Sequence, residues 1–359
     1  MSTKILGSKQ YPRLQPAVEL WKGYRPQEAP YRFAAATAAA ARAWQRRTRA
    51  ALAETLGFQD GPACPPRPRL IERVDKGDYV REKLVIRTAP DAEMPVYLLV
   101  PKNIRKPAPV VLAFHGHGYG VKDIVGLWED GSERNMPDGY HKDFGVAICR
   151  RGFIVAAPEI SCFGERQTDF AYLQRTGSGN SKPSTCTHSA MLAFHLGLSV
   201  VGLRVRDTRR LVDYLVTRRD VDLDRLGAMG ISGGGMHAFF SMCMDERIKA
   251  GVISGYYCTF RDSILAMFHC ACNFVPGLHA FGEMYDLVGL IAPRPLLVEA
   301  GDHDEIFPLG AVRRSVARAR AVYRLFGAAR VETDYFEGRH QISGRKAYDF
   351  FARELNSGC

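Results

Sequence analysis

The sequence lacks any long uninterrupted apolar run, and its first residues lack the apolar core of a secretory signal. A membrane-spanning helix needs about 20 consecutive, mostly apolar residues, and a signal peptide needs an apolar stretch before its cleavage site. These two absences argue against an integral membrane protein and against a secreted one. We therefore expect a cytoplasmic protein with no membrane partner.

The sequence also lacks the Cys-x-x-Cys pairs of zinc modules, although it has nine cysteines. They are Cys64, Cys149, Cys162, Cys186, Cys243, Cys258, Cys270, Cys272 and Cys359. Their odd number and wide scatter favour reduced thiols. His269, Cys270 and Cys272 are close together, but Cys-x-Cys with one histidine is not the usual spacing of structural zinc. We expect these three side chains to pack in the core or line a pocket, and we expect no metal and no cofactor.

Acidic residues are too few to balance the basic ones, because 38 aspartates and glutamates stand against 49 lysines and arginines, a formal net charge of +11. Such a charge attracts polyanions, but alone it says nothing of specific binding. No nucleic-acid-binding motif accompanies it. Many arginines recur on predicted helices: Arg204, Arg206, Arg209, Arg210, Arg313, Arg314, Arg318 and Arg320. We interpret them as solvated helix surfaces and expect no nucleic-acid partner.

The remaining composition is ordinary for a globular protein, since 46% of the 359 residues are hydrophobic and 24% are charged. Residues 31–56 form an alanine-rich run that predicts a helix ended by Gly57. A cluster of prolines between residues 62 and 68 then breaks the chain. We therefore divide the sequence into an N-terminal arm and helical extension at 1–68 and a catalytic domain at 69–359.

After residue 77, short apolar or alternating segments recur between helical stretches. The predicted strands cover residues 79–87, 95–100, 110–114, 153–157, 226–231, 250–254, 295–300 and 330–336. The predicted helices cover residues 142–151, 191–217, 235–244, 311–326 and 345–355. This order indicates an α/β protein with a mostly parallel central sheet of about eight strands and helices on both faces. Residues 119–140 and 257–291 fit neither pattern, and we expect them to be loop insertions that shape a pocket.

Ser232 lies at the centre of a Gly-x-Ser-x-Gly motif that follows an apolar strand and precedes a helical stretch. A serine hydroxyl is a poor nucleophile and must be held where a base can reach it. A sharp strand-to-helix turn achieves this, and small residues two before and two after the serine permit it. Gly230 and Gly234 occupy those positions. A glycine-rich turn with an incidental serine is the alternative, which the flanking strand and helix disfavour.

A nucleophilic serine needs a base and an orienting carboxylate, and both follow later strands of the sequence. Strand 295–300 leads into Asp302, Asp304 and Glu305, and strand 330–336 leads into His340. Open parallel sheets place their sites at this edge. We prefer Asp304 as the acid because it lies in the loop proper, whereas Asp302 could instead cap the turn. His340 has no rival in its loop.

The backbone amides that would bind an oxyanion are expected from two places. One is Gly233, directly after the nucleophile, and the other is His117 or Gly118 in the loop after strand 110–114. Glycines in this loop let the backbone approach a substrate oxygen. His115 and His117 are two residues apart on a strand end, so their side chains point apart and do not predict a metal site.

These motifs resemble the dienelactone hydrolase-like and acetyl xylan esterase-like branch of the α/β-hydrolase superfamily. The resemblance covers about residues 77–355 and rests on HGHG (115–118), FGER (163–166), GISGGG (230–235), HCACNFVPG (269–277), APRPLLVEAG (292–301), DEIFP (304–308) and EGRH (337–340). It implies an α/β-hydrolase fold, with Asp304 and His340 completing the triad of Ser232. The sequence departs from the family at Glu159, often an aspartate there, which we expect to be structural. Dienelactone hydrolase itself uses a cysteine, so the serine argues against that substrate.

The sequence therefore predicts a serine carboxylic ester hydrolase that forms an acyl-enzyme intermediate with a small-molecule ester. Acetyl or other small esters, including acetylated carbohydrate, are implied by the resemblance alone. A serine peptidase of the prolyl-oligopeptidase type is one alternative, but the region before residue 70 is too short for the propeller of those enzymes. A catalytically silent binding protein is another, against which the intact triad stands. The sequence leaves a homo-oligomer open.

Overall fold

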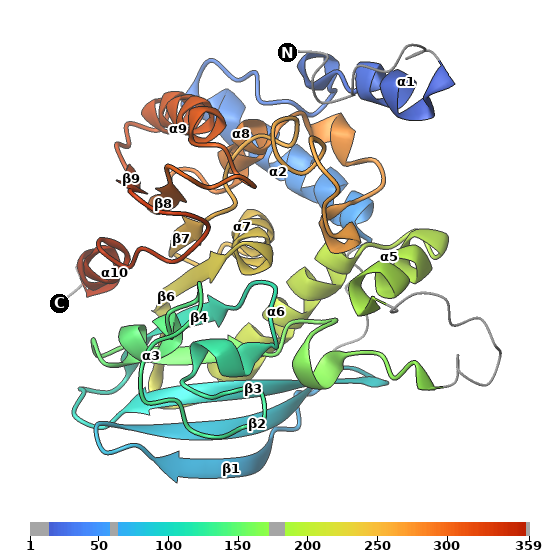
Figure 1. Cartoon of the computed structure of the whole chain (residues 1–359). Coiled ribbons are helices and arrows are strands. Elements are labelled where there is room, and N and C mark those ends of the chain that lie inside the picture. The colour runs from blue at the N-terminus through green and yellow to red at the C-terminus, as the bar shows by residue number, and fades with distance from the viewer. Residues whose placement is uncertain (1–13, 58–63, 172–183, 357–359) are drawn as a thin grey trace.

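A mixed sheet forms the centre of the computed structural model, which describes residues 14–57, 64–171 and 184–356 (Figure 1). Within these residues the sheet has nine strands in the order β1-β2-β3-β5-β4-β6-β7-β8-β9. The strands are β1 (Arg69–Asp75), β2 (Tyr79–Ala89), β3 (Ala92–Pro101), β4 (Ala108–Phe114), β5 (Ile154–Pro158), β6 (Val221–Ile231), β7 (Ala250–Ser254), β8 (Leu296–Gly301) and β9 (Val331–Phe336). The first three strands are antiparallel and β3 also pairs antiparallel with β5, whereas the pairs from β5 to β9 are parallel. The α/β-hydrolase fold expected from the sequence is confirmed.

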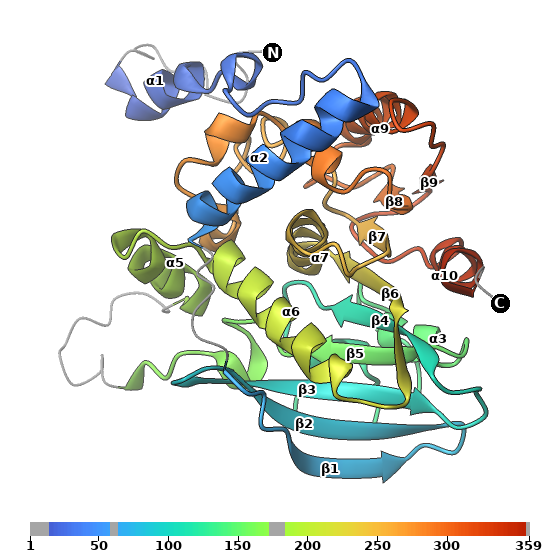
Figure 2. The same ribbon diagram turned by 180° about the vertical axis from the view of Figure 1, so that it is seen from behind.

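Helices cover both faces of the sheet (Figures 1 and 2). The helices are α1 (Pro16–Gly23), α2 (Ala38–Leu56), α3 (Phe144–Cys149), α5 (Thr185–His195), α6 (Val200–Val216), α7 (Gly233–Met244), α8 (Met284–Leu287), α9 (Leu309–Arg324) and α10 (Ala347–Asn356). One hydrophobic cluster joins the sheet to α3 and α10, and a larger one joins its other face to α2, α6, α7 and α9. The strands buried between them are apolar along their whole length, as β4 shows.

The sequence missed β1, and the sheet therefore has one strand more than the eight expected. Six of the seven residues of β1 are exposed, so the strand has no buried face to produce an alternating pattern. It forms the edge of the sheet and pairs with β2 alone. Backbone hydrogen bonds to β2 define this strand, and the pattern of apolar and polar side chains gives no sign of them.

Two helix predictions were wrong in their bounds. The helix predicted at 31–56 begins only at Ala38, because Thr37 caps it by accepting a hydrogen bond from the amide of Ala40 at 3.2 Å. The helix predicted at 191–217 is two helices, α5 and α6. The break lies at Gly197, whose φ is 69°, and Ser199 caps α6 by accepting from the amide of Gly202 at 2.9 Å.

The interpretation of the helix arginines as solvated was wrong for Arg204, whose exposed fraction is 1%. This side chain points from α6 into the larger core, where it lies near Cys272 and Ser161. The division of the chain at residue 68 stays a prediction. In the structure, α2 contributes Trp44 and Leu56 to the same core as the sheet.

No single helix among residues 14–57, 64–171 and 184–356 is long and apolar enough to cross a membrane. Helices α5 and α6 meet the length and composition test only when taken together, as a pair bent by 96°.

Candidate active site

Ser232 occupies the sharp turn between β6 and α7. Its backbone has φ 57° and ψ −122°, a conformation rare for a residue with a side chain. The turn needs glycine on both sides: a Cβ on Gly230 would lie 2.2 Å from the carbonyl oxygen of Gly234, and one on Gly234 would lie 2.0 Å from that of Phe114. The strain presents the serine at the start of a helix, where free amides favour negative charge.

Asp304 lies in the loop after β8, and its carboxylate is held from two sides. Oδ1 accepts hydrogen bonds from the amides of Ile306 at 2.9 Å and Phe307 at 3.0 Å. Oδ2 lies 2.7 Å from Nδ1 of His340, and the aspartate side chain is 1% exposed. A buried carboxylate bonded to Nδ1 fixes the orientation of the imidazole.

His340 lies in the loop after β9 and brings its ring beside the serine turn. A Cβ on Gly255 would lie 2.8 Å from Cε1 of His340 and 3.6 Å from Cγ1 of Ile231, the residue before the serine. The ring stacks against both Tyr140 and Phe307, with a centroid distance of 5.6 Å to each. Among the described residues, its buried Nε2 has no hydrogen-bond partner, so no bond joins it to Ser232 here. Catalytic hydrogen bonds often tighten only when substrate is bound.

The three candidate carboxylates for the acid role have different surroundings in the structure. Asp304 contacts the histidine, whereas Asp302 accepts a hydrogen bond from the amide of Gly338 at 2.9 Å and lies 2.7 Å from Nδ1 of His303. The Gly338 amide lowers the pKa of Asp302. Glu305 is exposed. Asp302 therefore stabilises the loop that carries the histidine, as the turn-capping alternative expected.

The loop after β4 lies against the serine turn. A Cβ on Gly116 would lie 3.1 Å from Cβ of Ser232, and one on Gly233 would lie 3.1 Å from the ring of His117. The amide of Gly116 donates to Nε2 of His141 at 2.7 Å, whereas the amides of His117, Gly118 and Gly233 form no hydrogen bond with any described residue. The assignment of these last three as oxyanion donors stays a prediction.

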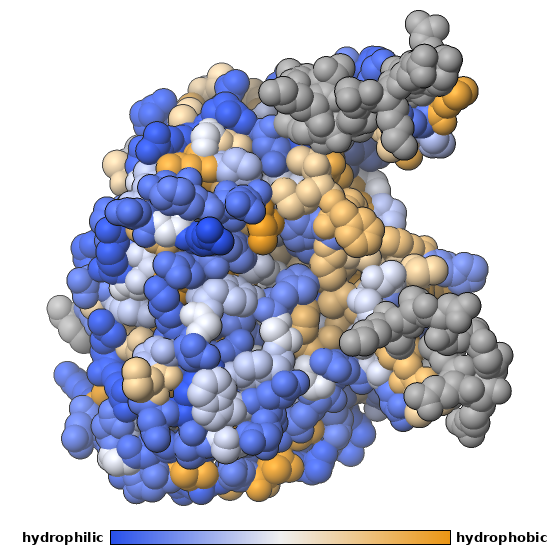
Figure 3. Space-filling view, viewed as in Figure 1, coloured by the Kyte–Doolittle hydropathy of each residue, from blue (hydrophilic) through white to orange (hydrophobic). Residues whose placement is uncertain are grey.

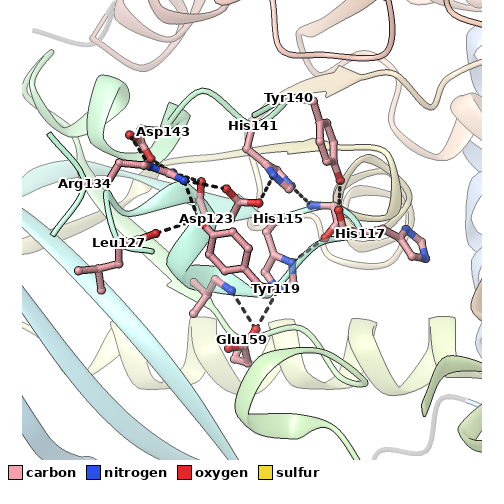
Figure 4. Close-up of polar contacts among 12 residues, drawn as sticks. His115, His117, Tyr119, Asp123, Leu127, Arg134, Tyr140, His141, Asp143 and Glu159 are labelled. Atoms are coloured by element: carbon pink, nitrogen blue, oxygen red, sulfur yellow. Dashed lines mark hydrogen bonds and ion pairs between the residues drawn. The ribbon is translucent and has the colours of Figure 1, made fainter. Parts of the chain in front are cut away.

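A buried polar network behind this loop fixes its position (Figure 4). Tyr140 donates its hydroxyl hydrogen to the carbonyl of His117 at 2.5 Å. Nδ1 of His141 lies 2.8 Å from Asp123, whose other oxygen lies 3.2 Å from the guanidinium of Arg134. Burial lowers the pKa of His141, which keeps the ring neutral and able to accept from Gly116.

Glu159 forms a second part of this support. Its carboxylate lies 3.1 Å from Nε2 of His115 and accepts a hydrogen bond from the amide of Val121 at 2.9 Å. Sequence reasoning missed Asp123 and Tyr140, which lie in the insertion at 119–140, and His141, which directly follows it, because none of them belongs to a local motif.

The insertion at 257–291 carries apolar surface. Phe268 is fully exposed, and Figure 3 shows hydrophobic residues gathered beside a hollow on the right of the view, over this segment. A pocket between this insertion and Tyr24 is lined on the insertion's side by Phe260, Ile264, Leu265, Asn273, Phe274, Val275, Gly277, Leu278, His279 and Gly282. None of these residues belongs to the predicted triad.

One group of side chains near the site could hold a metal ion. His117, Cys186, Cys270 and Cys272 each offer one ligand atom, and these atoms lie within 4.8 Å of one another. These residues come from three distant parts of the sequence, with only Cys270 and Cys272 close together. The spacing of cysteines and histidines along the chain therefore did not predict the group.

Comparison with known proteins gives a consistent result. The family model of the Abhydrolase family matches residues 19–331. YtaP of Bacillus subtilis (strain 168), which carries a provisional hydrolase name, is 28% identical over 262 residues, covering 71% of this chain and 80% of YtaP.

The solved structures that share the fold of this chain include two whose names give an ester-hydrolysing activity. A Bacteroides fragilis protein provisionally named an acetyl xylan esterase is 20% identical with a TM-score of 0.74, covering 94% of this chain and 87% of that one. A glucuronoyl esterase from Solibacter usitatus is 18% identical with a TM-score of 0.63, and the match covers 89% of this chain and 94% of that one.

Proposed function

The chain belongs to the Abhydrolase family, and from this membership we propose that it is a serine ester hydrolase with Ser232 as nucleophile, His340 as base and Asp304 as orienting acid. The observation that carries the proposal is the 2.7 Å contact between Asp304 and His340, with the free Nε2 of that ring beside the serine turn. An imidazole held at Nδ1 by a buried carboxylate, with Nε2 free, is arranged to take a proton from a neighbouring hydroxyl.

The reaction follows from these positions in two halves. Nε2 of His340 accepts the hydroxyl proton as Oγ of Ser232 attacks the ester carbonyl carbon. The tetrahedral oxyanion is stabilised by the amide of Gly233 and by that of His117 or Gly118. The same imidazole then donates its proton to the alcohol oxygen as the carbon–oxygen bond breaks. A water molecule, deprotonated by His340, attacks the acyl-enzyme, and the carboxylic acid leaves as the serine regains its proton.

The substrate we propose is an ester with a small acyl group. Aromatic rings crowd the reacting groups, since Tyr140 and Phe307 stack against His340 and the ring of His117 lies against Gly233. The names of the two neighbours of the same fold, an acetyl xylan esterase and a glucuronoyl esterase, support a carbohydrate ester. We therefore propose acetylated carbohydrate as the substrate class.

Steady-state hydrolysis of p-nitrophenyl acetate by the wild type and by Ser232→Ala tests the proposed function. Removing the nucleophile is expected to lower kcat by about 10³-fold or more, with the circular dichroism spectrum unchanged. Longer acyl chains on the same alcohol are expected to react more slowly than acetate. Near-native turnover by the variant would remove the serine from the mechanism, and faster cleavage of a prolyl peptide than of the acetate would favour a peptidase.

A further inference from the structure

We propose that His117, Cys186, Cys270 and Cys272 bind one structural zinc ion beside the active site. This inference goes beyond the proposed hydrolase function and does not depend on it. His117 belongs to the loop after β4, Cys186 to the first turn of α5, and the other two cysteines to the insertion. Three segments that are separate in the sequence thus direct metal-binding atoms to one point.

The distances between the ligand atoms suit zinc. The sulfurs of Cys270 and Cys272 are 3.2 Å apart, and Sγ of Cys272 lies 3.8 Å from Nε2 of His117. All four ligand atoms fall within 4.8 Å of one another. Around a tetrahedral zinc with Zn–S bonds of about 2.3 Å and a Zn–N bond of about 2.0 Å, ligand atoms lie about 3.5 to 3.8 Å apart. Small shifts of the side chains therefore complete the coordination.

The charge of a buried arginine is an independent observation that points to the same ion. Arg204 is 1% exposed and, among the described residues, has no carboxylate within 4.0 Å. It contacts Sγ of Cys272 at 3.6 Å, Ser161 at 3.1 Å and the ring of Phe163 at 5.6 Å. A buried cation without an anionic partner is strongly unfavourable.

Neutral thiols would leave that arginine charge uncompensated. A zinc ion bound by three thiolates and a neutral imidazole carries one net negative charge, which balances the guanidinium. Hydrogen-bond donors in contact with the sulfurs are characteristic partners of metal thiolates. Asn273 supplies another, since its side-chain amide lies 3.8 Å from Sγ of Cys272.

The four protein ligands would leave the ion no open position, so its role is structural. It would tie α5 and the insertion to the loop that carries the predicted oxyanion donors. Nε2 of His117 turns toward the cysteines, while Nδ1 and Cε1 lie against Gly233. Metal binding at Nε2 leaves the ring proton on Nδ1. The ion thereby holds one defined ring tautomer against the residue that follows the nucleophile.

Elemental analysis of the full-length protein, purified without chelator under reducing conditions, tests the site. The wild type is expected to contain about one zinc per chain. Cys186→Ala and Cys272→Ala are expected to lower the zinc content about tenfold or more. Cys258→Ala is the matched control, because it removes a buried cysteine of the same insertion that lies outside the group, and it should retain the zinc. Ser232→Ala should retain it too, which separates this test from that of the hydrolase function.

Cobalt substitution gives a second readout that does not depend on the folding of a variant. Wild-type protein exchanged into Co²⁺ is expected to show thiolate-to-cobalt charge transfer and the intense visible bands of tetrahedral coordination. Metal-free protein that takes up neither ion would overturn the proposal. A Cys270–Cys272 disulfide in the freshly purified chain, detected by peptide mass spectrometry, would overturn it equally.

Discussion

Two aspartates two positions apart play different parts in the geometry of one loop. Asp304 is buried against His340, whereas Asp302 accepts a hydrogen bond from the amide of Gly338. The first contact decides the orientation of an imidazole. The second decides the shape of the loop that carries it. Their substitution by asparagine should therefore have unequal effects on turnover.

Asp304→Asn is expected to lower kcat on p-nitrophenyl acetate by about 10²- to 10⁴-fold, because an amide does not stabilise the imidazolium and can reverse the tautomer of His340. Asp302→Asn is the matched control, since its amide oxygen still accepts from Gly338, and it should retain kcat within about threefold. The two variants should be compared at equal folded fraction. Equal loss in both, or full activity in the first, would contradict the assigned roles.

The sequence was sufficient to propose Ser232, Asp304 and His340, because each follows a strand within a short motif and the ends of parallel strands share one edge. It could not predict Tyr140, His141 or Arg204. Their contact partners are distant in the sequence, so no motif of fixed spacing predicts these contacts. Arg204 also follows the helical pattern of its solvated neighbours, and only tertiary packing distinguishes it from them.

At the scale of the element, the turn from β6 to α7 depends on close backbone approach. The carbonyl oxygens of Phe114 and His115 lie 2.0 Å and 2.5 Å from the position that a Cβ of Gly234 would occupy. Backbone atoms cannot move aside as a flexible side chain would. This contact joins β4, which leads to the predicted oxyanion loop, to the helix that follows the nucleophile.

Gly234→Ala is expected to destabilise the protein by about 3 kcal/mol, through overpacking against β4, and to abolish turnover. Gly310→Ala provides the control, because this glycine lies in α9 with no atom nearer than 4.0 Å to the added carbon. Alanine there should stabilise by about 0.5 to 1 kcal/mol. Urea unfolding of both variants measures the difference, and equal stability of the two would refute the account of the turn.

Element types were more predictable than element boundaries. The apolar strands from β4 to β9 and the helices between them follow from periodicity. The break between α5 and α6 was missed because valines continue at helical spacing past Ser199, which hides the cap. The start of α2 was missed because alanines precede Thr37, and alanine has a high helix propensity whether or not a helix forms.

Across the whole molecule, stability should depend on pH through a carboxyl group buried in the sheet. Glu299 lies in β8 and accepts a hydrogen bond from the amide of Gly344, in the loop that follows His340. Burial raises its pKa from 4.5 to about 7. Between these values the folded chain holds a proton that the unfolded chain has lost. The stabilisation from this group is therefore complete below pH 4.5 and is lost as the pH rises toward 7.

Glu299→Gln removes this titration while keeping an oxygen that can accept from Gly344. The free energy of unfolding of the variant, relative to wild type, should rise between pH 4.5 and 7 and then stay constant. The total gain is about 3 kcal/mol at most. Denaturant unfolding at a series of pH values measures it. A difference that does not change with pH would mean that the group titrates alike in both states.

The account as a whole depends on His340 activating the hydroxyl of Ser232. The most direct measurement is covalent labelling by a fluorophosphonate, followed by peptide mass spectrometry, because the reagent requires an activated serine. We predict one label per chain, located on Ser232, with labelling slowed about 10²-fold or more in folded His340→Ala. Labelling of a different residue, or no labelling of the folded wild type, would contradict the account.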